Sequence, residues 1–158
     1  MDNRLNKFVK TILDISFIIG LILEMLVPFG LKYAVRLVMR LLGETTEYAE
    51  ILNHYPYAVA SIMIVGAASL LILYELRRMM KTVIEDDCFV KQNVTSLYRM
   101  GTYAFIVAGL KLLRCFVYFT PAAVIIAGVF LFAGLLSKVL ARVFDRAVNY
   151  KQENDLTI

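Results

Sequence analysis

The sequence predicts an all-α, polytopic membrane protein with four transmembrane helices in a single domain, residues 1–158. Hydrophobic residues make up 60% of the chain, against roughly 45–50% in typical soluble domains, and the mean hydropathy is +0.71. These residues are gathered into runs close to the roughly 20 residues that a helix needs to cross the hydrocarbon core. The four runs with this length lie at about 11–30, 56–76, 101–119 and 121–141.

The distribution of charge predicts that both termini lie in the cytoplasm. The segments 1–10, 77–100 and 137–158 contain 3, 5 and 4 Lys or Arg, whereas segment 31–55 on the opposite side contains three. Lys and Arg accumulate in the cytoplasmic loops of membrane proteins. The same asymmetry explains the net charge of +4, so we infer no direct nucleic-acid partner.

A short amphipathic segment follows the first span. Pro28 and Gly30 interrupt the helical pattern there. In residues 31–43, Lys32, Arg36 and Arg40 recur at every fourth position on an otherwise apolar helix. This stripe predicts either an outer interfacial helix or a helix that caps the bundle with its cations in water.

The fourth span is expected to extend beyond the membrane. No stop signal ends it, and Ala141, Phe144 and Val148 continue the helical spacing of apolar residues. We therefore expect an amphipathic stem that packs on the helix beginning near Asn93. The acidic residues that follow the stem are expected to reach the nearby cations Arg77, Arg78, Lys81 and Arg99.

Three charged residues lie well inside the predicted spans, away from their cytoplasmic ends. A charge at the bilayer centre is unfavourable by roughly 2.5–3.5 kcal/mol. At about 1.5 Å per residue, Glu24 lies about 20 Å above Thr11, and Arg114 about 20 Å above Gly101, with Lys111 one turn lower. We expect an intramembrane ion cluster of Glu24, Lys111 and Arg114, which either fixes helix order or forms a ligand site.

Asp14 lies near the inner edge of the first span. At that depth, we expect its carboxylate to reach water or the basic residues Lys10 and Arg99.

The sequence contains no recognisable set of catalytic or metal-binding residues. His54 is the only histidine and lies in an outer loop, and Cys88 and Cys115 lack the spacing of a metal site. The acidic run 85–87 lacks the alternating oxygen ligands of a calcium loop. We expect no enzymatic activity, no cofactor and no metal site.

Two stretches resemble an uncharacterised bacterial family of four-pass membrane proteins. The stretch DDCFVKQNVTSLYRMG resembles its inner-loop signature at Phe89, Asn93, Arg99 and Gly101, with Cys88 where the family has proline. The ending VFDRAVNYKQENDLTI resembles its C-terminal signature, and the residues that carry this likeness are Glu153, Asn154, Asp155, Leu156 and Thr157. Family members are often encoded beside a small Cro-type helix-turn-helix regulator. The resemblance therefore implies a bacterial cell membrane and a regulatory partner.

The sequence favours a membrane-embedded regulatory or interaction protein. Its cytoplasmic surface, residues 77–100 and 141–158, would meet a protein partner such as the helix-turn-helix regulator. The side chains expected on this surface are Arg77, Arg78, Phe89, Asn93, Arg99, Phe144, Glu153 and Asp155. The alternative is a small transporter or ligand-binding membrane protein that uses Glu24, Lys111 and Arg114.

Overall fold

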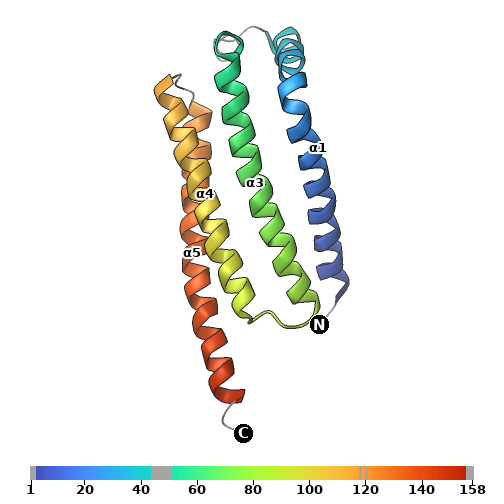
Figure 1. Cartoon of the computed structure of the whole chain (residues 1–158), viewed down its shortest axis with the longest axis vertical. Helices are drawn as coiled ribbons and strands as arrows, with labels where there is room; N and C mark the ends of the chain where they lie inside the picture. Colours follow the sequence, from blue (N-terminus) through green and yellow to red (C-terminus); the bar gives the residue numbers. More distant parts are fainter. Residues whose placement is uncertain (1–2, 44–50, 118, 120, 156–158) are drawn as a thin grey trace.

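The computed structural model describes residues 3–43, 51–117, 119 and 121–155. These residues form four long helices and no strand, which confirms the all-α prediction. The helices are α1 (Asn3–Leu42), α3 (Tyr55–Ile84), α4 (Lys91–Val117) and α5 (Pro121–Asp155). Figure 1 shows them running alongside one another, with both chain ends and the connection between α3 and α4 at the same end of the molecule.

Within the described residues, three helices are long and apolar enough to cross a membrane. They span Arg4–Leu41, Tyr55–Ile84 and Pro121–Asn154. These helices support a multi-pass membrane protein. The helix α4, which contains the predicted third span and both Lys111 and Arg114, is not among the three.

The helices pack in a row rather than in a closed bundle. The helix α1 contacts α3, α3 contacts α4, and α4 contacts α5, and no other pair of these helices is in contact. The contact between α4 and α5 is the most extensive. Its buried residues are mostly small, as expected where helix association in lipid depends on close packing. They include Ala104, Val107, Ala108, Ala123, Ala127 and Ala141.

Two glycines allow the close approach of α4 and α5. A Cβ atom on Gly101 would lie 3.0 Å from the carbonyl oxygen of Gly134. A Cβ atom on Gly134 would lie 2.9 Å from the Phe105 ring and 3.2 Å from the Gly101 carbonyl oxygen. The two backbones therefore meet where neither residue has a side chain.

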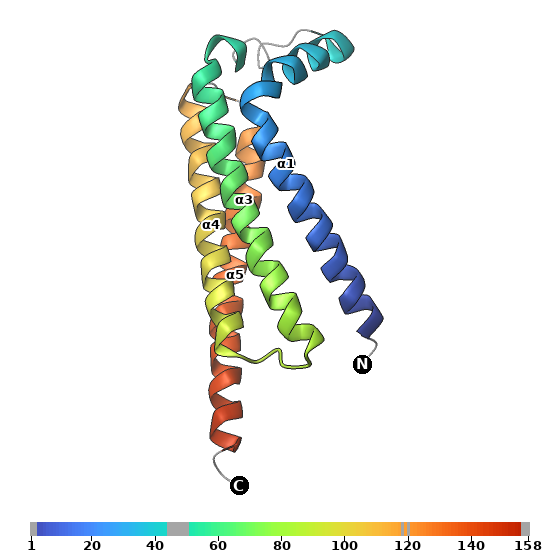
Figure 2. The same ribbon diagram turned by 45° about the vertical axis from the view of Figure 1, so that its right-hand side comes forward.

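The helix α1 continues through Pro28 to Leu42 as a single element. Figure 2 shows that its upper part turns away from its lower part. A proline inside a helix removes one backbone hydrogen bond and commonly kinks the helix. The hydroxyl of Tyr55 donates to the Pro28 carbonyl oxygen at 2.9 Å. The predicted outer interfacial helix is thus a bent continuation of α1, and not a separate helix, up to Gly43 with φ of 88°.

A tight turn follows α3 at the end of the molecule that contains both termini. Asp86 has φ of 57°, a conformation that Asp adopts more readily than most residues. The amide of Asp87 donates to the Thr82 carbonyl oxygen at 3.0 Å, which closes the turn. The connection then leads into Lys91 at the start of α4. Figure 1 shows that α5 extends past this connection, as the continuing apolar spacing predicted.

Candidate functional site

Buried polar residues join α3 to α4 near this end of the molecule. Glu75 on α3 has only 2% of its surface exposed. Its carboxylate accepts a hydrogen bond of 2.6 Å from the hydroxyl of Ser96, which is fully buried on α4. Arg99 lies 3.3 Å from the same carboxylate and Arg78 lies 4.0 Å from it. The arrangement satisfies a carboxylate that would otherwise be unfavourable at a buried helix contact.

Neither Glu75 nor Ser96 was predicted from the sequence as part of a site. The available signal was a single acid, three positions before Arg78, at the end of an apolar run. A carboxylate at such a position needs a partner. The spacing alone places Arg78 beside it, but only the packing of α4 on α3 adds Ser96 and Arg99.

Asn93 connects the turn after α3 to α4. Its side-chain amide donates to the Thr82 hydroxyl at 2.7 Å and to the Cys88 carbonyl oxygen at 2.8 Å. Only 1% of the residue is exposed, and its amide oxygen has no hydrogen-bond partner among the described residues. The expectation that Asn93 lies on an accessible surface is therefore wrong, because its side chain is used to hold the turn.

Apolar contacts hold the stem of α5 against the connection and α4. The rings of Phe89 and Phe144 lie 5.4 Å apart, centroid to centroid. Ala141, the last residue of the predicted fourth span, is fully buried, and Val148, which lies beyond that span, is 2% exposed. The residues of α4 buried in the same region are Val94, Leu97 and Met100.

Two ion pairs border this apolar contact. Lys91 lies 2.9 Å from Asp145, and Lys151 lies 2.8 Å from Asp87. Both pairs are partly exposed, so each contributes only about 0–1 kcal/mol. They fix how the stem is aligned, because they link Lys91 at the start of α4 and Asp87 in the connection to two positions of the stem that are six residues apart. We call residues 77–100 and 141–155 the loop–stem surface.

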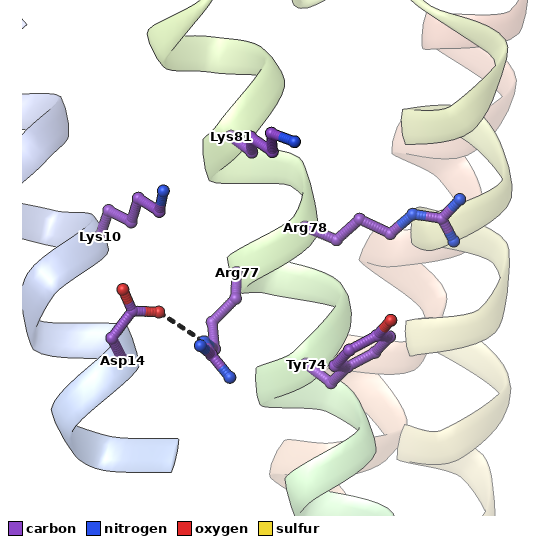
Figure 3. Close-up of a pocket in the computed structure, with 6 residues that line it drawn as sticks. All are labelled: Lys10, Asp14, Tyr74, Arg77, Arg78 and Lys81. Carbon is purple, nitrogen blue, oxygen red and sulfur yellow. Dashed lines mark hydrogen bonds and ion pairs between the residues drawn. The ribbon is translucent and has the colours of Figure 1, made fainter. Parts of the chain in front are cut away.

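A cavity of about 330 Å³ lies between α1 and α3 at the same end. Figure 3 shows Lys10 and Asp14 extending from α1 toward α3, and Arg77 reaching back to Asp14. The Arg77 Nε donates to the Asp14 carboxylate, and its guanidinium lies 4.5 Å from the Phe17 ring centroid. The lining residues are Lys10, Asp14, Tyr74, Arg77, Arg78 and Lys81.

The Asp14 side chain is 36% exposed, which agrees with the expected access to water, but its ion-pair partner was not predicted. It pairs with Arg77 of α3, not with Arg99 of α4. The reason is the helix order, since α1 packs on α3 and does not contact α4. Arg99 instead forms an ion pair with Glu75.

The acidic end of the chain was expected near the cations of α3 and α4. Arg77 is paired with Asp14, while Arg78 and Arg99 are paired with Glu75. Glu153 is exposed on the part of α5 that extends past the other helices. The side chain of Asp155 and residues 156–158 lie outside the described part of the chain.

The structure does not bring Glu24 to the two cations of α4. In the described part of the chain, no ion pair within 4.0 Å joins Glu24 to Lys111 or Arg114. The carboxylate lies against α3, where a Cβ atom on Gly66 would be 2.6 Å from its carboxyl carbon. One of its oxygens is buried without a hydrogen-bond partner. Because α3 lies between α1 and α4 in the row, the matching depths of these charges do not make them neighbours.

A family comparison covers most of the chain. Residues 40–158 match DUF2975, described as a protein family of unknown function. This chain belongs to DUF2975. No curated protein and no solved structure matches it. The DUF2975 match includes both stretches that carry the resemblance noted above, and it agrees that the family is uncharacterised.

The DUF2975 match includes some features of this end of the molecule and excludes others. The Glu75 cluster and the loop–stem surface lie entirely within residues 40–158. In contrast, Lys10 and Asp14, which form the α1 side of the cavity, precede the matched region. The loop–stem surface is therefore the candidate site that belongs to the family region as a whole.

Proposed function

We propose that this DUF2975 protein is a four-span protein of the bacterial cell membrane that presents the loop–stem surface to a cytoplasmic protein. Its role is regulatory or scaffolding rather than catalytic. The helix-turn-helix regulator implied by the family resemblance is the first candidate partner.

The four-span topology is supported by the arrangement of the helices. At 27 residues and about 1.5 Å per residue, α4 is about 40 Å long, enough to cross the hydrocarbon core. Both chain ends lie at one end of the molecule (Figure 1), as an even number of crossings requires. The excess of Lys and Arg in segments 1–10, 77–100 and 137–158 favours the cytoplasm for that end.

The observation that carries the proposal is the ordered stem beyond the apolar part of α5. A free helix end in water usually frays, yet here Phe144 contacts Phe89, and Lys91 and Lys151 pair with Asp145 and Asp87. The contacts combine a loop and a helix end into one continuous surface. A surface assembled from two distant segments is suited to recognising a partner.

Exposed aromatic residues lie on this surface. Tyr150 is 67% exposed, Phe89 is 47% exposed and Tyr98 is 38% exposed. Aromatic side chains are enriched at protein interfaces, where they bury a large area at little entropic cost. Phe89 and Tyr150 lie outside the predicted spans, so contact with lipid acyl chains does not explain their exposure.

Photocrosslinking in intact membranes tests this function. A photoreactive amino acid replaces Tyr150 in the full chain, and the control replaces Phe132, which is 64% exposed on the same helix within the apolar span. We expect a protein adduct from position 150 and none from position 132. Mass spectrometry of the adduct identifies the partner.

Two further variants connect the adduct to the surface. Phe144→Ala removes the ring contact with Phe89 and should reduce the adduct at position 150. Val139→Ala changes a residue of the same helix that is also 56% exposed but lies outside the loop–stem surface, and it should not reduce the adduct. If positions 150 and 89 both yield no protein adduct, the proposed function is wrong. A cytoplasmic adduct that is not a helix-turn-helix protein would reject that partner alone.

A further inference from the structure

The cavity between α1 and α3 contains more positive than negative charge. Four of its six lining residues are cations, and Asp14 is the one carboxylate. Glu75 on the far side of α3 lies 4.0 Å from Arg78 and offsets part of the positive charge of that residue. The remaining cations Lys10, Arg77 and Lys81 outnumber Asp14. A net positive cavity at the end of apolar helices is expected to attract an anion.

The positive groups remain able to bind a ligand. Among the described residues, Lys10 and Lys81 form no ion pair within 4.0 Å. Arg77 uses Nε to donate to Asp14, and neither of its terminal nitrogens has a hydrogen bond in the same part of the chain. Ammonium groups and the end of a guanidinium are donors of the kind that bind phosphate oxygens.

The surface next to the cavity is apolar. A second cavity of about 460 Å³ lies farther along the contact of α1 with α3. Leu21 and Ala67, which line it, lie seven residues from Asp14 and Tyr74, or about two helical turns along the same faces. Its other lining residues are Glu24, Met25, Met63 and Ile64. Glu24 contributes the only charge, and its carboxylate is turned against the Gly66 backbone.

We propose that the α1–α3 cavity binds the phosphate of an anionic phospholipid, whose acyl chain follows the contact of α1 with α3 to the apolar cavity two helical turns farther on. The charged cavity corresponds to the head group of a lipid, and the apolar cavity farther along the helices corresponds to its acyl chain. This order favours a lipid over a soluble phosphate, which would leave the apolar cavity unfilled. The proposal depends on the membrane placement described above, but it does not depend on a protein partner.

Lipid-dependent fluorescence quenching tests this assignment. The chain contains no Trp, so a single Trp in place of Leu71, which is 44% exposed and three residues before Tyr74, reports on nearby lipid. The full chain is reconstituted in phosphatidylcholine vesicles that contain increasing amounts of brominated phosphatidylglycerol. Brominated phosphatidylcholine in place of the anionic lipid measures the unselective contact. We expect the anionic lipid to be preferred by at least about tenfold, since each basic group contributes about fivefold.

Two variants that each remove two positive charges distinguish the effect of the cavity on lipid preference from the effect of general surface charge. Lys10→Gln/Lys81→Gln removes two basic groups and should lower the preference for brominated phosphatidylglycerol by about 25-fold. Arg142→Gln/Arg146→Gln removes two exposed cations from α5 near the same end and should change the preference less than about twofold. Circular dichroism and the elution volume show whether each variant is folded.

Three outcomes would overturn the proposal. Equal quenching by the two brominated lipids would show that the cavity has no anionic preference. An equal loss in the Arg142/Arg146 variant would assign the preference to surface charge. Release of the quenching by millimolar inorganic phosphate or glycerol phosphate, but not by equal ionic strength of chloride, would assign the site to a soluble phosphate. Because no partner protein is present, none of these results depends on the proposed function.

Discussion

The carboxylate of Glu75 on α3 accepts a hydrogen bond of 2.6 Å from the hydroxyl of Ser96 on α4. Both residues are buried, and Arg99 and Arg78 supply the nearby positive charge. The two cations are themselves partly exposed, with side-chain exposures of 51% and 37%. The cluster is therefore asymmetric: the acid depends on the cations more than the cations depend on the acid.

This asymmetry predicts an ordering of variants. Arg78→Gln/Arg99→Gln leaves a buried carboxylate without a cation and should lower the free energy of unfolding by about 2 kcal/mol. Glu75→Gln removes the charge while the cations stay in contact with water, so its effect should be below about 1 kcal/mol. Unfolding by dodecyl sulfate in micelles, followed by circular dichroism, measures both.

The triple variant provides the control for this cluster. Adding Glu75→Gln to the double arginine variant should recover at least half of the lost stability, because no buried charge remains. A triple variant no more stable than the double would show that the ion contacts are not what stabilises this helix contact.

A second prediction concerns the contact of α1 with α3 at Gly66. A Cβ atom there would lie 2.6 Å from the carboxyl carbon of Glu24, so Gly66→Ala must displace that side chain. We expect a loss of about 1–3 kcal/mol from overpacking. Gly128→Ala, at a position with nothing within 4 Å, is the matched control and should be neutral.

The same contact can be tested by removing the obstructing group. In a Glu24→Ala background, Gly66→Ala should lose most of its effect, since the two residues are coupled through one space. Equal effects of Gly66→Ala with and without the Glu24 side chain would contradict the described packing. Thermal unfolding in detergent measures the four variants of this cycle.

A third prediction concerns the close approach of α4 and α5. Gly134→Leu inserts a side chain where the Gly101 carbonyl oxygen and the Phe105 ring leave about 3 Å, so the helices must separate. Gly109→Leu adds the same side chain to α4 at a position with nothing within 4 Å. Faster hydrogen exchange in α4 and α5 is expected for Gly134→Leu only. Equal exchange in the two variants would show that this glycine contact is not required.

The fourth prediction is the topology. Cys88 and Cys115 are first changed to Ser, and single cysteines are then placed at His54 or Lys81, which are both exposed. A membrane-impermeant maleimide should label position 54 in intact cells and position 81 only after lysis. Lys81 is preferred to Asn93 as a probe because Asn93 is buried. Labelling of position 81 in intact cells would reverse the orientation.

The sequence by itself determined the helical class and the positions of the long apolar helices α1, α3 and α5. Hydrophobic run length is a local property, and it needs no knowledge of neighbours to indicate a helix in lipid. The extension of α5 was visible for the same reason, since Ala141, Phe144 and Val148 repeat at helical spacing. The pairing of the stem with residues near Asn93 followed from unused apolar faces on both segments.

Only the tertiary structure decided which charges meet. Depth along a helix can be estimated from sequence, but the order of helices in the row cannot, and that order places α3 between Glu24 and the cations of α4. Because of the same helix order, Arg77 pairs with Asp14, and Arg99 pairs with Glu75. In lipid, apolar faces do not distinguish one neighbour from another. The choice therefore depends on the fit of small residues such as Gly101 and Gly134, a property of two surfaces together and not of either segment alone.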